Sequence, residues 1–135
     1  MTDEHPDPDV VDLATRLFGC ARTGDTATLT AYIDAGVPAN LTNHKGDTLL
    51  MLAAYHGHRA TAAALLERGA DPDRLNDRGQ SPLAGAVFKG EEEVITLLLA
   101  HGADPDTGTP SARETARAFD RTDLLALLDT PPGRA

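Results

Sequence analysis

Glycine recurs along this chain at a fixed spacing, and no other feature of the sequence constrains the fold as strongly. The recurring glycines form three series with a spacing of 33 residues: Gly24, Gly57 and Gly90; Gly36, Gly69 and Gly102; and Gly46 and Gly79. A glycine that returns at one phase of a repeat marks a backbone position with positive φ, such as a helix end or a tight turn. The three series therefore predict a structural unit of about 33 residues that is repeated along the chain.

The segments between these glycines are predicted to be helical. Two helix pairs are expected, at 48–56 with 58–68 and at 81–89 with 91–101. Ser81 followed by Pro82 favours a helix start, because the serine oxygen can cap free amides and proline has a preset φ. Each helix has about ten residues, fewer than the roughly 12–15 at which an isolated helix becomes marginally stable in water. Stacking on neighbouring helices must therefore stabilise them.

These motifs resemble those of the ankyrin-repeat family. The family pattern is an Asp/Asn-x-x-Gly turn, a Thr-Pro-Leu-His helix start, paired alanines, a glycine, a Leu-rich second helix and Gly-Ala-Asp. The matching stretches here are NHKGDTLLMLAAYHGHRATAAALLERGADPDRL (43–75) and NDRGQSPLAGAVFKGEEEVITLLLAHGADPD (76–106). The resemblance implies an all-α fold: an ankyrin-repeat solenoid of about four helix-turn-helix units with short β-turn tips.

The resemblance covers residues 10–129, which we expect to form a single ankyrin-repeat domain. The expected units are about 10–42, 43–75, 76–106 and 107–129, and the last is in register only with a shift of 30 residues. The first unit lacks a preceding turn, as a capping unit would. The acidic, Pro-rich segment 1–9 and the tail 130–135 (TPPGRA) are expected to be flexible.

Two departures from the family pattern affect the expected stability. Met51 and Ala84 replace the histidine that follows Thr-Pro-Leu in the family, and Gly85 stands where Leu52 stands one unit earlier. A mid-helix glycine costs about 1 kcal/mol relative to alanine, and a missing leucine side chain loses about 2–3 kcal/mol of burial. We therefore expect a marginally stable array.

Composition excludes several classes of partner. The formal net charge of −9 disfavours nucleic acid and anionic membrane surfaces, since both are bound through a surplus of Lys and Arg. A single cysteine, the absence of a signal-peptide pattern and the lack of a long apolar run predict a cytoplasmic protein. The frequent Arg, Ala, Asp, Gly and Pro residues indicate a GC-rich, bacterial genome. Cys20 shares its place in the repeat with Ala53 and Ala86, so we expect it to be buried and unreactive.

The sequence predicts neither a metal or other cofactor nor an enzymatic activity. His44, His56 and His58 are close in sequence, but His56 and His58 flank Gly57 at a helix junction, where their side chains are expected to diverge. No nucleophile–base pair or carboxylate dyad is evident. The run 91–93 (EEE) is expected to complement the dipole of the helix it begins. The repeated Asp-Pro-Asp is interpreted as turn chemistry.

The aromatic residues indicate a binding surface. Tyr55 and Phe88 take the same place in successive units, near the end of the first helix, and in ankyrin folds that place faces the concave groove. Phe119 falls beside the equivalent place in the last unit, and Phe18 takes the place of Met51. Four of the five aromatic residues are thus expected on one side of the stack. An exposed aromatic row is typical of a protein interface.

We expect a partner protein to bind this groove and the turn tips through an apolar, mildly acidic segment, with the chain acting as an accessory or regulatory factor. The expected partner-binding residues are Phe18, Arg22, His44, Lys45, Asp47, Tyr55, His56, Asp77, Arg78, Gln80, Phe88, Lys89 and Phe119. The aromatic residues would supply affinity, and the charged and polar residues would set specificity. The alternative is a homo-oligomer that uses the same aromatic patch for self-association.

Overall fold

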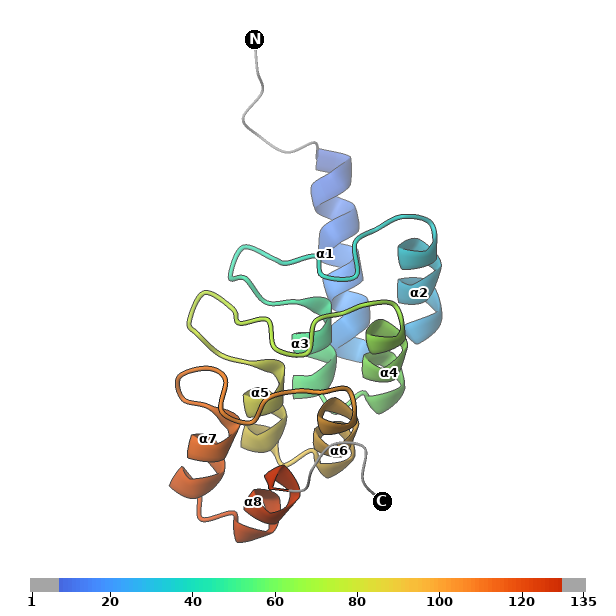
Figure 1. Ribbon diagram of the computed structural model, residues 1–135. Helices are drawn as coiled ribbons and strands as arrows, with labels where there is room; N and C mark the ends of the chain where they lie inside the picture. The colour runs from blue at the N-terminus through green and yellow to red at the C-terminus, as the bar shows by residue number, and fades with distance from the viewer. Residues whose placement is uncertain (1–7, 130–135) are drawn as a thin grey trace.

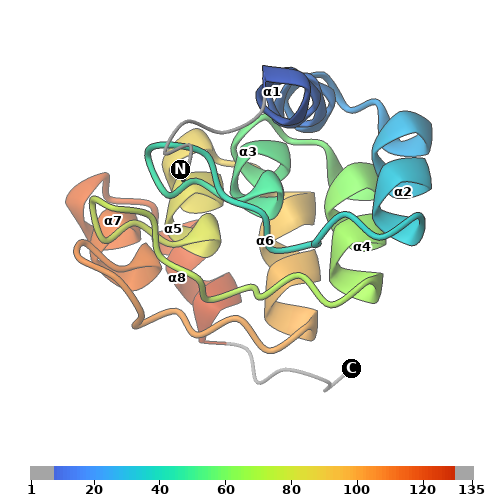
Figure 2. The same ribbon diagram turned by 90° about the horizontal axis from the view of Figure 1, so that it is seen from above.

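The computed structural model of the chain describes residues 8–129, which contain eight α-helices in two rows (Figures 1 and 2). The inner row consists of α1 (Pro8–Thr23), α3 (Leu49–Tyr55), α5 (Pro82–Lys89) and α7 (Ala112–Ala118). The outer row consists of α2 (Thr26–Asp34), α4 (Arg59–Glu67), α6 (Glu92–Ala100) and α8 (Thr122–Leu128). Each helix packs against its partner in the pair and against the next helix of its own row. The predicted all-α solenoid is confirmed.

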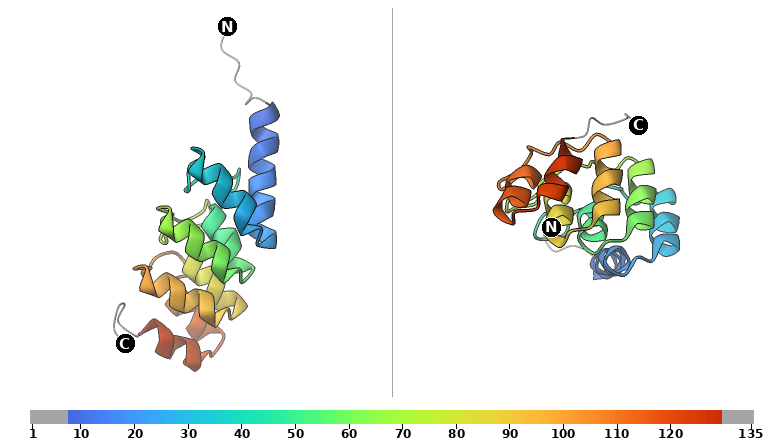
Figure 3. Two further views of the ribbon diagram at one scale, coloured as in Figure 1. Left: turned by 90° about the vertical axis from the view of Figure 1, so that its right-hand side faces the viewer. Right: turned by 90° about the horizontal axis from the view of Figure 1, so that it is seen from below.

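The helix pairs follow one another as a stack from α1–α2 to α7–α8 (Figure 3). Three loops, which we call the fingers (residues 43–47, 76–80 and 106–110), precede α3, α5 and α7 and project on the same side of the stack (Figure 1). Isolated β-bridges join Thr42 to Thr48 and Gly108 to Ser111, and no strand forms within residues 8–129. α1 already begins at Pro8, so the predicted flexible segment 1–9 is too long; residues 1–7 and 130–135 lie outside the described residues.

The glycine series end helices and turns, as predicted. All eight of these glycines have positive φ, between 72° and 123°. Gly46, with φ 76°, also needs to lack a side chain, because a Cβ there would lie 2.8 Å from the backbone nitrogen of Asp77 in the next unit. In the last unit, Asp120 takes the place of Gly90 and adopts a φ of 53°. Asp120 is thus a non-glycine residue in a conformation that favours glycine.

Buried hydroxyl side chains start the inner helices. Thr48, Ser81 and Ser111 are the N-caps of α3, α5 and α7, and each accepts a hydrogen bond of 3.0–3.1 Å from the backbone amide three residues further on. At α7, Glu114 also accepts a hydrogen bond from the Ser111 amide, which completes a capping box. Helix α5 has Pro82 in its first turn, so the start predicted from Ser81–Pro82 is confirmed.

The core lies between the two rows and consists mainly of Leu and Ala side chains. Leu50, Leu65 and Leu98 are fully buried. Cys20 is 8% exposed, and its counterparts in the next two units are also buried, which confirms its predicted place. Burial raises the pKa of the Cys20 thiol, and the charge of Asp25 raises it further.

The Asp-Pro-Asp turns connect successive units. Asp71 Oδ1 accepts a hydrogen bond from the Asp73 amide, and Asp104 Oδ1 accepts one from the Asp106 amide, each at 2.9 Å. Asp73 Oδ1 in turn accepts a hydrogen bond of 2.8 Å from the Asp104 amide in the following unit. The repeated carboxylates therefore organise turns, as predicted. No helix within residues 8–129 combines the length and apolarity required to cross a bilayer.

Candidate functional site

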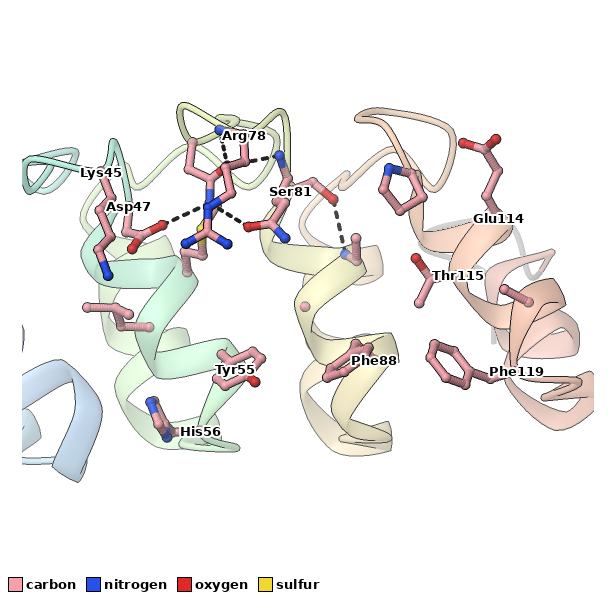
Figure 4. Close-up of a pocket in the computed structure, with 18 residues that line it drawn as sticks. Lys45, Asp47, Tyr55, His56, Arg78, Ser81, Phe88, Glu114, Thr115 and Phe119 are labelled. Carbon is pink, nitrogen blue, oxygen red and sulfur yellow. Dashed lines mark hydrogen bonds between the residues drawn. The ribbon is translucent and has the colours of Figure 1, made fainter.

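A groove of about 740 Å³ runs across α3, α5 and α7 beneath the fingers (Figure 4). The residues that line it on the inner helices and at their starts are Met51, Leu52, Tyr55, His56, Ser81, Ala84, Gly85, Phe88, Glu114, Thr115, Ala118 and Phe119. The finger residues that line it are Lys45, Asp47, Asn76, Arg78, Gln80 and Pro110. Its volume is in the range of sites that hold a ligand.

Three rings form a continuous row along one end of the groove. Tyr55 and Phe88 stack with centroids 6.5 Å apart and planes inclined by 10°, and Phe88 meets Phe119 edge-on with centroids 5.5 Å apart. We call Tyr55, Phe88 and Phe119 the aromatic row. Phe88 is 56% exposed and Phe119 is 57% exposed, whereas Tyr55 is half-buried. The predicted exposed row on one side of the stack is thus present for these three residues.

Three basic side chains lie in or beside the groove, whose lining also contains the carboxylates of Asp47 and Glu114. Lys45 and Arg78 extend from neighbouring fingers at the end opposite the aromatic row (Figure 4). Within residues 8–129 neither side chain belongs to an ion pair. A third cation, Lys89, places Nζ 5.0 Å from the centroid of the Tyr55 ring. These cations are free to attract a carboxylate, although the chain as a whole has a net charge of −9.

The acidic groups of the groove already have partners. Asp47 Oδ1 accepts a hydrogen bond of 2.9 Å from Asn76 Nδ2, which links two fingers. Glu114 Oε1 accepts a hydrogen bond of 2.9 Å from the Ser111 amide in the capping box. The fingers are also joined through the backbone, since the Asp77 amide donates to the Lys45 carbonyl at 3.0 Å. The carboxylates of Asp47 and Glu114 therefore hold the fingers and the start of α7 in place, while the side chains of Lys45 and Arg78 remain available to bind a partner.

The structure brings most of the predicted site residues together. Those that line the groove are Lys45, Asp47, Tyr55, His56, Arg78, Gln80, Phe88 and Phe119. Lys89 lies beside the groove, above the Tyr55 ring. His44 and Asp77 are exposed on the fingers outside the lining, and Arg22 is exposed at the last turn of α1.

The prediction for Phe18 is wrong. Its side chain is 3% exposed and packs in the core between α1 and its neighbours. Phe18 shares its place in the repeat with Met51, which is 7% exposed and lines the groove, whereas Phe18 is not part of the lining. The residue of α1 that shares the place of Tyr55 is Arg22. Phe18 therefore stabilises the first unit and does not belong to the groove.

The predicted divergence of His56 and His58 is also wrong. Their rings lie nearly parallel, 24° apart, with centroids separated by 6.5 Å. The left-handed turn at Gly57 brings the two side chains to the same side. His58 Nε2 lies 2.7 Å from the Arg22 carbonyl and so connects two units. Within residues 8–129, no group of three or more His, Cys, Asp or Glu side chains is arranged to hold a metal ion.

The surroundings of His56 lower the pKa of its imidazole. Partial burial lowers the pKa of His56, and the positive charges of His58, Lys89 and Arg22 lower it further. His56 also meets Tyr55 edge-on, with ring centroids 5.3 Å apart. The imidazole is therefore biased toward its neutral form, and it extends the aromatic row toward α1.

Sequence reasoning missed the floor of the groove. Ala84 and Gly85 lie on α5 between the flanking helices and line the cavity. The sequence marks both residues only as departures from the family pattern, and it indicates a loss of packing at Gly85. The available signal was the replacement of Met51 and Leu52 by the two smallest residues one unit later. Such a replacement leaves a hollow only if the side chains of the two neighbouring helices, α3 and α7, do not fill the space.

Comparison with known proteins agrees with this architecture. A family model described as "Ankyrin repeats (3 copies)" matches residues 17–109. A Pseudomonas aeruginosa protein named as an ankyrin repeat protein, PA3287, is 48% identical over 62 residues, which cover 42% of this chain and 35% of the relative. The solved structure of the human ASB11 ankyrin repeat domain superimposes with a TM-score of 0.74 at 29% identity, covering 83% of this chain and 52% of that domain. The chain thus spans about a third of the bacterial relative and half of the human domain.

Proposed function

Because this chain belongs to the ankyrin-repeat family, whose repeats are generally protein–protein interaction modules, we propose that it binds a segment of a partner protein in the groove across α3, α5 and α7. The observation that carries this proposal is the exposure of the aromatic row. Phe88 and Phe119 each leave more than half of their surface in water, at 56% and 57%. Large apolar side chains in a continuous exposed row favour an interface.

The chemistry of the groove indicates the character of the partner segment. The aromatic row favours apolar side chains, and the unpaired Lys45 and Arg78 favour a carboxylate. The overall charge of −9 repels other acidic surfaces, so an acidic partner would be accepted mainly at this basic edge. The helices and hydrogen-bonded fingers hold the groove in place before binding, which limits the entropy lost on association.

The chain is proposed to act by binding alone, in keeping with a family that is generally non-catalytic. Its role would be that of an accessory or regulatory factor for the partner protein. The groove residues serve recognition well, because they offer rings, a lysine and an arginine, and no adjacent nucleophile and base.

Affinity capture from the host organism tests the proposal. The immobilised wild-type chain is compared with Tyr55→Ala/Phe88→Ala, which removes two rings of the aromatic row. The matched control is Val10→Ala/Val11→Ala, which removes two exposed apolar side chains from α1, far from the groove. We expect wild type and control to retain the same partner and the groove variant to lose it. A partner retained equally by all three proteins would contradict groove binding.

Self-association is the alternative use of the aromatic row. The exposure of Phe88 and Phe119 suits a second copy as well as a foreign partner. The net charge of −9 on each copy opposes such a dimer, so we favour the foreign partner. A light-scattering series over protein concentration separates the two. A dimer that Phe88→Ala dissociates would support self-association, and a monomer at all concentrations would support a foreign partner.

A further inference from the structure

The floor of the groove is recessed on one helix only. The groove face of α5 carries the buried Ala84 and the half-buried Gly85 at its centre, whereas α3 carries Met51 and Leu52 at the same places in the repeat. Both residues on α5 are therefore smaller than their counterparts in the preceding unit. The resulting hollow lies in the middle of the inner row, where α3 and α7 flank α5 (Figures 1 and 4).

The helix on the other side closes this hollow. At the corresponding places, with the shift of 30 residues, α7 carries Glu114 and Thr115. The Tyr55 ring forms another wall, because a Cβ built on Gly85 would lie 3.5 Å from Tyr55 Cδ1. Gly85 thus keeps a hollow open that the leucine of the preceding unit would fill.

The hollow lies between two chemically different ends. Phe88 is at its apolar end, and the helix start at Ser81 is at its finger end, next to Arg78, with Lys45 on the far side of Arg78 near the start of α3 (Figure 4). Gly85, in the floor of the hollow, follows Ser81 by four positions, which corresponds to about 6 Å at 1.5 Å per residue, and the side chains of Lys45 and Arg78 lie at the finger end of the groove. An extended segment covers about 7–13 Å in two to four residues. A partner segment could therefore reach the hollow and the basic side chains with residues two to four positions apart.

We propose that the hollow over Ala84 and Gly85 is an anchor pocket for one bulky apolar side chain of the partner segment, and that Lys45 and Arg78 bind a carboxylate two to four residues from that side chain. Gly85 then determines specificity, because it admits the anchoring side chain. This inference rests on groove binding as proposed above. It adds the pattern of the ligand: a Phe, Trp, Leu or Met side chain combined with a nearby Asp or Glu.

A random twelve-residue peptide library displayed on phage tests the pattern. The library is selected on the immobilised full chain after depletion on Gly85→Leu, and enriched peptides are synthesised and measured by calorimetry. We expect enriched peptides to share a bulky apolar residue with an acidic residue two to four positions away. Peptides that lack the acidic residue, or no enrichment over the depleted pool, would overturn the inference.

Variants of the floor then test the pocket. Gly85→Leu is expected to weaken binding of the enriched peptide at least about tenfold, and Gly85→Ala by less than about threefold, since alanine adds only a methyl group. Should Gly85→Leu fail to fold, Ala84→Met fills the same hollow with the side chain found at that place in α3. Unchanged affinity in a folded Gly85→Leu or Ala84→Met variant would overturn the pocket.

Charge variants test the binding of the carboxylate, and variants of the aromatic row distinguish groove binding from the anchor pocket. Lys45→Glu/Arg78→Glu is expected to weaken the peptide at least about tenfold, whereas Arg59→Glu/Arg74→Glu, at exposed positions outside the lining, has little effect. Binding that Tyr55→Ala/Phe88→Ala abolishes but Gly85→Leu leaves unchanged would retain groove binding and reject the anchor pocket. Binding that neither variant affects would reject both.

Discussion

The rings of Tyr55 and Phe88 lie nearly parallel, with centroids 6.5 Å apart, although the two residues belong to successive units of the repeat. The next ring in the row, Phe119, continues the contact at 5.5 Å from Phe88. Each ring therefore contacts a neighbour on the row and keeps another surface in water, as the 56% exposure of Phe88 shows. Contacts between the rings therefore hold the aromatic row in position, and the exposed part of its surface can still bind a partner.

The exposure of Phe88 predicts a small contribution to folding. Phe88→Ala is expected to lower the free energy of unfolding by about 1 kcal/mol, the usual value of an aromatic pair. Leu83→Ala, at a fully buried place on the same helix, is expected to lower it by about 2–5 kcal/mol. Urea denaturation followed by circular dichroism measures both. Equal losses for the two variants would show that Phe88 belongs to the core.

The backbone of Asp120 predicts a stabilising substitution. Asp120 adopts a φ of 53° at the place that Gly90 takes, with φ 72°, in the preceding unit. Asp120→Gly is expected to raise the free energy of unfolding by about 0.5–1 kcal/mol, because glycine adopts this conformation without steric cost. Gly90→Ala provides the opposite control and is expected to destabilise the chain. Thermal unfolding measures both, and a destabilised Asp120→Gly would contradict this explanation.

The lowered pKa of His56 predicts a dependence of stability on pH. The unfolded chain takes up a proton on this imidazole at a higher pH than the folded chain does. The free energy of unfolding is therefore expected to fall as the pH drops below about 6.5, down to the lower pKa of the folded state. His56→Gln, measured beside wild type from pH 5 to pH 8, isolates this contribution. Parallel curves for the two proteins would contradict the assignment.

Burial of Cys20 predicts slow thiol chemistry. The side chain is 8% exposed, and its pKa is raised by burial, so little thiolate is present or accessible in the folded chain. Reaction with a thiol reagent is expected to be slow in buffer and fast in denaturing urea. Absorbance of the released chromophore follows the reaction. A similar rate in both solutions would show that Cys20 is accessible without unfolding.

Most of the architecture could be predicted from the sequence, because only a few residue types can occupy the backbone positions that define a unit. Positive φ at Gly57 and a hydroxyl cap at Ser81 leave recognisable residues at fixed intervals. Their recurrence predicts the ends of α3, α4, α5 and α6 to within one residue. It also identified Cys20 as a core residue through its alanine counterparts.

The site was less predictable, because the repeat register gives the place of a residue and not the space around it. The register links Phe18 to Met51, and both side chains are buried, but only Met51 lines the groove. The hollow at Gly85 arises from missing side chains, which leave no motif. Its existence depends on the sizes of residues on three helices at once.

Binding on the aromatic row is tested most directly by the dissociation constant of the captured partner, determined by calorimetry with three proteins. We expect Tyr55→Ala/Phe88→Ala to weaken binding at least about a hundredfold, since two interface anchors at about 1.4 kcal/mol or more each are lost. Val10→Ala/Val11→Ala is predicted to bind as wild type does. A dissociation constant for the groove variant within about threefold of the wild-type value, with both variants folded, would contradict the claim that the partner binds on the aromatic row.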